Sequence, residues 1–367
     1  MSPKKIYAII GEASGDLHAS NLIRELKLKG DYEIMGMGGE LMQKEGVNIL
    51  HDYREVNYMG FIDVIKNLRT ILNRIQLLKK EISSIKPDAV LLIDFPAFNL
   101  RIARHCKKIG IKVIYYISPQ IWAWKQSRVK QIKENVNEMI TILPFEKAFY
   151  KNFGMDVHYV GHHLLDALKK YPYHQDFIEQ LKNKANGKKI VALLPGSRKS
   201  EIASKLPIML ALADKYKNNY HFVIAGAPGA NRELYGNTSH DIYFGETYNI
   251  LKSSDAALVT SGTATLETAL HMVPQVVCYK TSEFNYQAGK RLIKVKYISL
   301  VNLILNKPAV TELIQHDLNM VRLEKEFLNM MGEGKEQIIN DYKNLIELLA
   351  LEGASERAAE IINKSML

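Results

Sequence analysis

The stretch from residue 190 to residue 202 contains residue types that suit an anion. An apolar run, 190–194, is followed by a Pro-Gly pair and then by Ser197 and Arg198. The run predicts a strand buried on both faces, and the Pro-Gly pair ends it, so a helix should begin directly afterwards. Gly196 would let a ligand approach the backbone, Ser197 would cap the helix, and Arg198 would pair with two oxygens at once. The stretch predicts a phosphate or pyrophosphate site; the alternative is a capped turn with a solvated arginine.

A second turn rich in glycine and hydroxyl groups follows another apolar run, 256–259. It consists of Ser261, Gly262 and Thr263, and it opens a helix that carries Glu267 one turn farther on. Because free N–H groups at helix N-termini bind anions, the two helix starts would converge on one diphosphate. Glu267 would then bind a ribose diol.

A polar loop follows the first apolar run of the chain, 6–10, and precedes a helical run at 17–28. The candidate residues in this loop are Gly11, Glu12, Ser14, Gly15 and Asp16. The glycines permit a tight turn, while the serine and the aspartate can cap a helix or bind hydroxyls. The loop lacks the G-x-G-x-x-G dinucleotide pattern, and its acidic character suits sugar hydroxyls better than phosphate. A purely structural cap is the alternative.

Asp94 is the candidate for a group that accepts a proton. It follows the apolar run 89–93 and is succeeded by Phe95 and Pro96. We therefore expect it at the carboxyl end of a sheet in apolar surroundings, which would raise the pKa of its carboxyl group and make it a better proton acceptor. Alternatively, Asp94 is the N-cap of a helix that begins near Phe98.

Both tryptophans of the chain, Trp122 and Trp124, follow the apolar run 112–117. Two indoles beyond a strand end would form an aromatic wall for a sugar or an acyl chain. Core packing is the ordinary alternative for tryptophan.

A periodic apolar helix with basic residues among its polar positions begins near Met59. Its start, which includes Met59, Phe61 and Ile62, would enter a lipid interface beside anionic headgroups. The alternative is a helix that faces the core and has a solvated basic face.

The elements that must position these residues alternate between strand and helix. Apolar runs predict strands at 6–10, 89–93, 112–117, 139–143, 157–160, 190–194, 221–225, 256–260 and 275–279. Such alternation implies right-handed βαβ units and parallel sheets. A polar, lysine-rich stretch at 171–189 separates the two halves. We therefore predict an α/β protein with two Rossmann-like domains, 1–170 and 171–345, that bind ligands at the carboxyl ends of their strands. A helical tail, 346–367, would pack on the N-terminal domain or on a partner subunit.

Composition restricts the classes of partner. A net charge of +10 and a pI near 9.2 suit nucleic acid, an anionic membrane surface or a phosphorylated substrate. We find no nucleic-acid-binding motif, and the acidic residues do not cluster at metal-ligand spacing, so we expect neither nucleic acid nor a metal. No apolar run is long enough to span a bilayer or to serve as a signal peptide, so any membrane contact would be peripheral. Cys106 and Cys278 lie far apart, which favours a reducing cytosol.

Several motifs together resemble the lipid-A-disaccharide synthase family, glycosyltransferase family 19 of the GT-B superfamily. They occur in order along nearly the whole chain, at 11–16 (GEASGD), 93–99 (IDFPAFN), 118–124 (SPQIWAW), 143–146 (LPFE), 194–198 (LPGSR) and 261–267 (SGTATLE). As a set they are highly specific, although the Pro-Gly-Ser-Arg element alone is not.

The resemblance implies an inverting hexosyltransferase of GT-B architecture, with two domains facing across a cleft. It would act in lipid A and lipopolysaccharide biosynthesis at the cytoplasmic face of a Gram-negative inner membrane. The substrates would be UDP-2,3-diacylglucosamine and 2,3-diacylglucosamine 1-phosphate, joined through a β-1,6 bond with release of UDP. No cofactor is implied, because UDP enters only as part of the donor, and the family pairs as a homodimer through its C-terminal part.

The resemblance also implies roles for single residues. Asp94 matches the general base, Arg198 the diphosphate-binding arginine, Glu267 a nucleotide contact and Asn302 an active-site asparagine. An inverting transfer needs one base for the acceptor hydroxyl and cationic groups for the leaving diphosphate, which agrees with the residue types.

Two positions depart from the family's pattern, because His163 and Val301 stand where proline is common. The competing interpretations are another UDP-sugar-dependent GT-B enzyme, namely a peptidoglycan-type transferase or a UDP-sugar epimerase, and a non-catalytic nucleotide-binding protein at the membrane.

Overall fold

The computed structural model describes residues 2–55, 67–292, 295–349 and 351–367. Met59, Phe61 and Ile62, the residues predicted to meet lipid, lie outside the described residues. The chain forms two compact units, of which unit 1 is Met1–Ala167 with Leu349–Leu367 and unit 2 is Leu168–Leu348. These limits fall close to the expected boundaries at 170/171 and 345/346.

Unit 1 contains a seven-stranded sheet in the order β3-β2-β1-β4-β5-β6-β7, with every pairing parallel. Its strands are β1 (Lys4–Ile9), β2 (Tyr32–Gly38), β3 (Asn48–Asp52), β4 (Ala89–Ile93), β5 (Lys112–Tyr116), β6 (Glu138–Thr141) and β7 (His158–Tyr159). Its helices are α1 (Ala13–Lys27), α2 (Glu40–Lys44), η1 (Tyr53–Glu55), α4 (Leu68–Ile85), α5 (Pro96–Lys108), α6 (Ile121–Trp124), α7 (Arg128–Asn135), α8 (Pro144–Lys151) and α18 (Ala354–Met366), and α9 (His163–Lys170) leads out of it.

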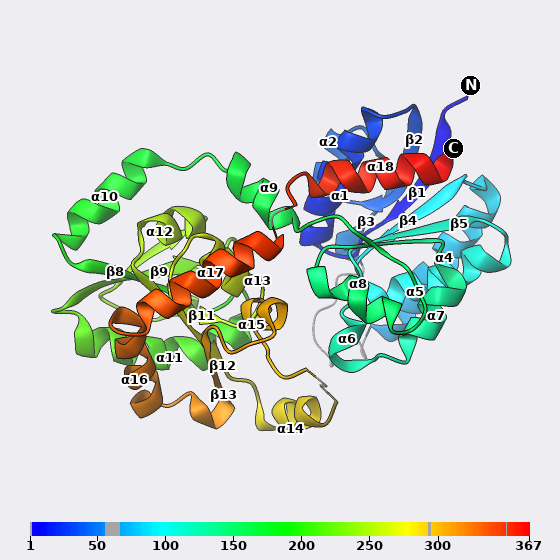
Figure 1. The fold of residues 1–367 in the computed structure, drawn as a ribbon. Coiled ribbons are helices and arrows are strands. Elements are labelled where there is room, and N and C mark those ends of the chain that lie inside the picture. Colours follow the sequence, from blue (N-terminus) through cyan, green and yellow to red (C-terminus); the bar gives the residue numbers. More distant parts are fainter. Residues whose placement is uncertain (1, 56–66, 293–294, 350) are drawn as a thin grey trace. The chain divides into compact units, whose positions relative to one another are not determined.

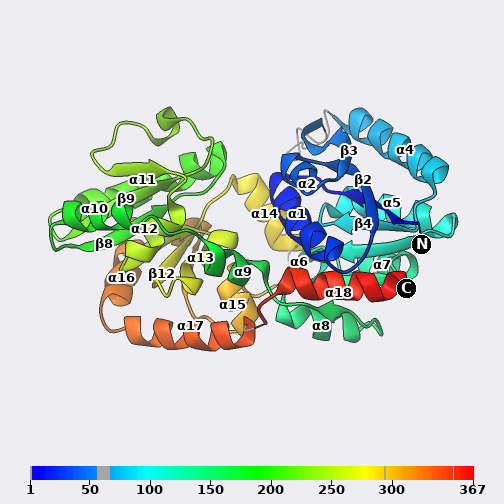
Figure 2. The same cartoon turned by 90° about the horizontal axis from the view of Figure 1, so that it is seen from above.

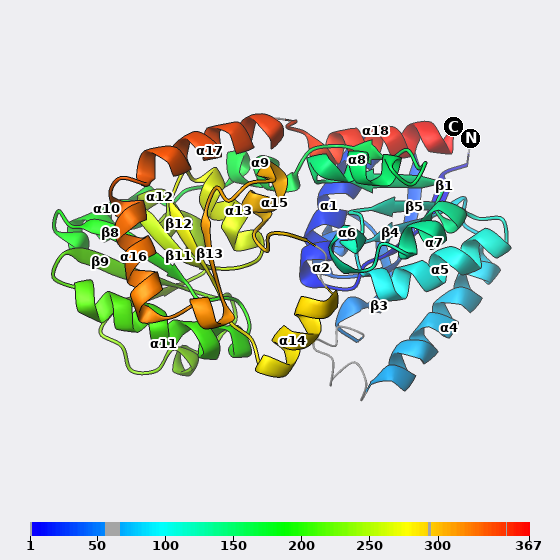
Figure 3. The same cartoon turned by 60° about the horizontal axis from the view of Figure 1, so that its bottom comes forward.

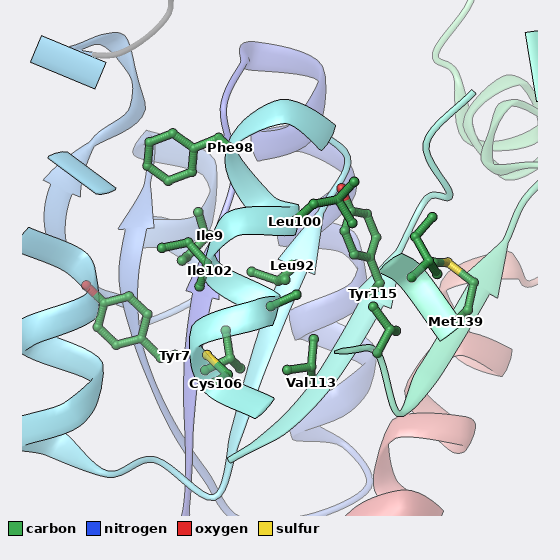
Figure 4. Close-up of a cluster of buried hydrophobic side chains, with 14 of the residues drawn as sticks. Tyr7, Ile9, Leu92, Phe98, Leu100, Ile102, Cys106, Val113, Tyr115 and Met139 are labelled. Carbon is green, nitrogen blue, oxygen red and sulfur yellow. The ribbon is translucent and has the colours of Figure 1, made fainter. Parts of the chain in front are cut away.

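Helices cover both faces of this sheet, with α1, α8 and α18 on one side and α4, α5 and α7 on the other (Figure 3). For this reason β4 is apolar and buried along its whole length. The core between β1, β4, β5 and helix α5 includes Tyr7, Leu92, Phe98, Cys106 and Tyr115 (Figure 4).

The C-terminal helix α18 lies along α1 in unit 1, although most of the chain separates them in sequence (Figure 1). Arg357 donates two hydrogen bonds to the carbonyl of Val160, at 3.0 and 2.8 Å. Asp166 accepts from the backbone N–H groups of Gly353 at 2.7 Å and Ala354 at 2.9 Å. These contacts fix the start of the tail helix on the N-terminal unit of the same chain.

Unit 2 contains a six-stranded parallel sheet in the order β10-β9-β8-β11-β12-β13. Its strands are β8 (Lys189–Leu194), β9 (Tyr220–Gly226), β10 (Asp241–Phe244), β11 (Ala256–Thr260), β12 (Gln275–Tyr279) and β13 (Thr311–Ile314). Its helices are α10 (Gln175–Ala185), α11 (Lys199–Tyr216), η2 (Arg232–Tyr235), α12 (Thr247–Ser253), α13 (Thr263–Leu270), α14 (Glu283–Leu292), α15 (Leu300–Leu305), η3 (Gln315–Asp317), α16 (Met320–Met331) and α17 (Lys335–Leu349). Helices α10 and α12 pack together beside β8 (Figure 2).

The two sheets confirm the prediction of two Rossmann-like halves followed by a helical tail. In each sheet the strand order reverses at one point, between β1 and β4 in unit 1 and between β8 and β11 in unit 2. Loops diverge at such a switch point and leave room for a ligand. The four loops that follow these strands contain most of the candidate residues, so the candidate sites coincide with the switch points of the two sheets. Among the described residues, no helix combines the length and the apolar character that crossing a bilayer requires.

Candidate active site

A cavity of about 550 Å³ opens at the switch point of unit 2. Its walls come from the loops after β8, β9, β10 and β11, and they include Gly196, Ser197, Arg198, Ser261, Gly262, Thr263 and Glu267. The structure thus brings the predicted donor-side residues together from two separate turns, as converging helix N-termini require.

The predicted anion cradle is the turn after β8. Gly196 has φ +120°, and a Cβ there would come within 2.6 Å of Glu201. The N–H groups of Ser197 and Arg198 both donate to Oε2 of Glu201, at 3.0 and 3.3 Å, and the Arg198 guanidinium donates to Oε1 at 3.2 Å. These bonds form a capping box on α11, in which Arg198 is the N-cap and Glu201 supplies the carboxylate, so the prediction that Ser197 caps the helix is wrong. The donors of this turn hold a carboxylate of the chain itself, at a helix N-terminus of the kind that binds anions.

Lys205 lies one helical turn beyond Glu201, near enough for the charges of Glu201 and Arg198 to act on it, although it does not line the cavity. Its side chain is buried, and burial lowers the pKa of its ammonium group while the charge of Glu201 raises it. Sequence reasoning missed this lysine, although a lysine among apolar positions of a helix was the signal available.

The turn after β11 supplies the opposite wall of the cavity. Gly262 has φ +145°, a conformation that favours glycine, and it is the N-cap of α13. The Ser261 hydroxyl donates to the carbonyl of Ile298 at 2.9 Å, so this turn is tied to the chain that precedes α15. The exposed hydroxyl of Thr263 stands in the first turn of α13.

Glu267 lies deeper in the cavity wall and accepts a hydrogen bond from the Tyr248 hydroxyl at 2.9 Å. Burial raises the pKa of the Glu267 carboxyl group, and the bond from Tyr248 opposes that rise. The ring of Tyr171 packs edge-on against Tyr248, with 4.9 Å between centroids, and both rings line the cavity. An aromatic surface beside a carboxylate suits a nucleoside, and sequence reasoning did not select either tyrosine.

Asn302 is not among the residues that line this cavity. Its side chain is buried and exchanges hydrogen bonds with the backbone of Val310 and with Glu312, all at 2.9 Å. Glu312 also accepts from the N–H and hydroxyl of Ser299. The asparagine therefore secures the turn that holds Ser261, and the neighbouring Val301 is buried in α15.

In unit 1, Asp94 stands directly after β4, at the switch point of that sheet. Burial raises the pKa of its carboxyl group to about 6, and the negative charge of Glu12 adds to the shift. The N-cap of α5 is Phe95 and no side chain caps that helix, so Asp94 does not have the capping role given as its alternative. A carboxylate with a raised pKa at a strand end is suited to accept a proton near neutral pH.

The loop after β1 lies beside Asp94. A Cβ on Gly11 would come within 2.2 Å of the Phe95 ring, so the glycine permits this close approach. Ser14 donates its hydroxyl to Glu12. Asp16 is buried and accepts from the N–H groups of Gly39, Leu41 and Met42 at 3.0–3.1 Å, which caps α2. Gly15 is buried at the start of α1, so Glu12 and Ser14 are the loop's partly exposed polar side chains.

The two tryptophans do not share one wall. Trp122 is buried and donates from Nε1 to Glu146 at 3.3 Å, whereas Trp124 is 44% exposed beside Lys125 and Arg128. Glu146 is fully buried, and burial raises the pKa of its carboxyl group to about 7. This carboxylate ties the loop after β5 to the start of α8, and sequence reasoning missed it.

His163, one of the two departures from the family's pattern, begins α9. Its imidazole packs against His18, with 3.6 Å between ring centroids, and against His162 at 4.4 Å. Burial lowers the pKa of all three imidazoles, so they pack as neutral rings at neutral pH. Among the described residues, no group of three or more His, Cys, Asp or Glu side chains is placed to hold a metal ion.

The family model for lipid-A-disaccharide synthetase matches residues 6–365 of this chain. The chain belongs to the lipid-A-disaccharide synthase family. A member from Syntrophus aciditrophicus is 39% identical over 372 residues, which cover 98% of this chain and 97% of that protein. The departures at His163 and Val301 therefore occur within a family member.

Solved structures show that the fold is GT-B. The calicheamicin glycosyltransferase superposes with a TM-score of 0.63 at 14% identity and covers 100% of this chain and 99% of its own. The UDP-GlcNAc 2-epimerase from Neisseria meningitidis gives 0.62 at 14% identity, with 99% of both chains covered. Transferases and epimerases share this fold, so membership of the lipid-A-disaccharide synthase family rests on the sequence match and not on the architecture.

Proposed function

We propose that this protein is a lipid-A-disaccharide synthase. It transfers diacylglucosamine from UDP-2,3-diacylglucosamine to 2,3-diacylglucosamine 1-phosphate, forms a β-1,6 bond and releases UDP. The observation that carries the proposal is the family match over nearly the whole chain, joined to an anion cradle and a nucleoside-sized cavity in unit 2.

Asp94 accepts the proton of the attacking hydroxyl group of the acceptor. The hydroxyl oxygen then bonds to the anomeric carbon of the donor from the face opposite the diphosphate. The bond from that carbon to the diphosphate oxygen breaks, and its electron pair leaves with UDP. One displacement of this kind inverts the anomeric centre, and a base whose pKa lies near 6 is deprotonated at neutral pH.

Arg198 and the N-termini of α11 and α13 stabilise the negative charge that develops on the leaving diphosphate. The N–H groups of Ser197 and Arg198 already hold a carboxylate, so a phosphate oxygen can take the same donors. Glu267 binds the ribose, and Tyr171 and Tyr248 face the base. Because these groups supply positive charge at the diphosphate, the proposal requires neither a cofactor nor a metal.

A turnover assay tests the proposal. The purified protein is incubated with radiolabelled UDP-2,3-diacylglucosamine and 2,3-diacylglucosamine 1-phosphate, with and without EDTA. We expect disaccharide 1-phosphate and UDP in equal amounts, and the same rate in EDTA. Release of free sugar without disaccharide, or conversion of the UDP-sugar to an epimer, would reject the transferase, and a rate abolished by EDTA would reject metal independence. No turnover by the wild-type protein, with UDP binding that Asp94→Ala leaves intact, would favour a non-catalytic nucleotide-binding protein.

The acyl chains of both substrates require contact with a membrane, which we propose is peripheral and at the cytoplasmic face of the inner membrane. Helix α4 supports this, because Leu68 and Leu72, one turn apart, are 45 and 41% exposed, with Arg69 also exposed beside them. Apolar side chains beside basic ones suit an anionic bilayer surface.

Vesicle sedimentation tests this docking. Leu68→Ser combined with Leu72→Ser should reduce binding to phosphatidylglycerol vesicles, whereas Leu28→Ser, a change at a leucine that is 77% exposed after α1, should not. Equal binding by both variants would reject docking through α4. We also propose that the protein forms a homodimer, as the family resemblance implies. Light scattering tests this, and a monomer mass at assay concentrations would reject it.

A further inference from the structure

Two consecutive residues at the end of β4 have a left-handed backbone. Asp94 has φ 45° and Phe95 has φ 49°. Aspartate tolerates this conformation better than most residues, but a bulky aromatic residue rarely adopts it. Such strain persists only where the surroundings hold the chain in place, and it is concentrated at functional sites.

Two buried side chains bond to the carbonyl groups of this turn. Nδ2 of Asn99, in the first turn of α5, donates to the carbonyl of Asp94 at 2.8 Å and to that of Ile93 at 3.2 Å. The hydroxyl of Tyr115, on β5, donates to the same Asp94 carbonyl. Figure 4 shows Tyr115 reaching from β5 toward the beginning of α5. Both side chains are completely buried, so water does not compete for these bonds.

The turn has a consequence for the carboxylate. It places the Phe95 ring against Gly11, at a distance that excludes any side chain there. The same packing brings Glu12 near enough to Asp94 for its charge to act on the Asp94 carboxyl group. A relaxed backbone at 94 and 95 would rotate both side chains and would break this arrangement.

We propose that Asn99 and Tyr115 are positioning residues, which hold the left-handed turn at Asp94 and Phe95 and thereby fix the place of the Asp94 carboxylate. This inference rests on the proposed function, in which Asp94 accepts the acceptor's proton. Neither residue touches substrate in this scheme, because both bond to the backbone of the turn.

The experiment compares single-group deletions. Tyr115→Phe removes one hydroxyl, and Asn99→Leu removes the amide at similar volume. Displacement of a reacting group by about 1 Å costs on the order of 100-fold in rate, so we expect each variant to lose about tenfold to a hundredfold in kcat. The KM for each substrate should stay within about twofold of wild type. The acid limb of the pH profile should move to lower pH as the carboxylate becomes more solvated.

The matched control is Tyr116→Phe. Tyr116 is also fully buried, on the same strand, but its side chain lies on the opposite face of the sheet beside Ser355. This variant loses a buried hydroxyl without touching the turn, so its kcat and pH profile should equal those of wild type. If Tyr116→Phe lost as much kcat as Tyr115→Phe, the proposal would be overturned. The loss would then follow from removing any buried hydroxyl of this strand and not from its bond to the turn.

Asp94→Asn distinguishes a failure of the proposed base from a failure of the proposed positioning residues. If Asp94→Asn abolishes turnover while Tyr115→Phe and Asn99→Leu match wild type in kcat and pH profile, the positioning role is wrong and the proposed base stands. If Asp94→Asn retains turnover, the proposed base itself is wrong, whatever the other variants do.

Discussion

The switch points of the two sheets hold their charged groups in opposite ways. In unit 1 the backbone of Asp94 is bonded by buried donors, and burial together with the nearby charge of Glu12 raises the pKa of its carboxyl group. In unit 2 the side chain of Arg198 is 60% exposed, and the partner that the structure records for its guanidinium is Glu201 on the same helix. One group is fixed in place, and the other is free to change partners.

The difference follows from what each group must do. Proton transfer requires heavy atoms within hydrogen-bond reach, so displacement of the base lowers the rate of turnover. A diphosphate is attracted by charge over a longer distance, and it must enter and leave in every turnover. An exposed arginine paired with a replaceable carboxylate meets the second need, while a strained turn held by buried donors meets the first.

Of the variants that test this difference between the two units, Asp94→Asn should have the largest effect, a loss of kcat. Loss of a general base costs about 10²- to 10⁴-fold in kcat. Removing this half-buried carboxylate should also stabilise unit 1 at pH 7, because its folded-state pKa is raised to about 6. Asparagine tolerates the left-handed backbone at this position. Product formation and urea unfolding measure the two effects.

Asp156→Asn is the matched control for this change, because Asp156 is an exposed aspartate of the same unit. It should leave both turnover and stability at wild-type values. UDP binding, measured by calorimetry, should be unchanged in both variants, since the cavity belongs to unit 2. An Asp94→Asn variant that is slower but also less stable would contradict the account of a destabilised carboxylate.

Arg198→Ala should weaken UDP binding by about tenfold to a hundredfold, since hydrogen bonds to a charged group are worth roughly 1.5–3 kcal/mol. Arg198→Lys keeps the charge but loses the two-oxygen geometry, so its affinity should be intermediate. Arg232→Ala, at an exposed arginine of unit 2 outside the cavity wall, serves as control. Calorimetric titration with UDP gives the three values, and equal affinity of Arg198→Ala and wild type would remove Arg198 from the site.

The pH dependence of turnover should show the same contrast. Because the carboxylate of Asp94 must be deprotonated, kcat should fall about tenfold per pH unit below a pKa near 6. The sign for stability is the reverse: between about pH 4 and 6 the folded state binds more protons at Asp94 than the unfolded state, so this residue's contribution falls as pH rises. UDP affinity should change little across this window. A flat rate profile from pH 5 to 7 would contradict the assignment.

Sequence patterns predicted the buried strands well, because burial on both faces produces unbroken apolar runs. The expected runs at 89–93, 256–260 and 275–279 coincide with β4, β11 and β12. No apolar run predicted β2, β3, β10 or β13. Glycines interrupt β2, and β3 and β10 are partly exposed edge strands, while β13 is a short edge strand. Edge strands need no apolar run, so a hydrophobic pattern cannot reveal them.

The candidate residues divide in the same way. Residues at strand ends, such as Asp94 and Arg198, could be selected from the sequence because a polar group after an apolar run marks the edge of a sheet. The side chain that supports Asp94 from the next strand could not, because Tyr115 acts through a contact that is distant in sequence and looks like an ordinary core position. Tertiary hydrogen bonds have no periodic signature, so the structure was needed to find them.

Glu201→Gln should have the smallest effect of these variants, a change in UDP affinity. It tests directly whether the exposed pair of Arg198 and Glu201 in unit 2 opens to bind a diphosphate. The carboxylate of Glu201 occupies the donors that a diphosphate needs, so removing its charge should tighten UDP binding by about twofold to tenfold. Glutamine keeps one oxygen that can accept from the backbone, and so it keeps part of the cap on α11. Glu201→Ala removes the cap as well, and it should lower the thermal unfolding midpoint. If Glu201→Gln weakens UDP binding instead, Glu201 orients Arg198 for the ligand and is not a carboxylate that the ligand displaces.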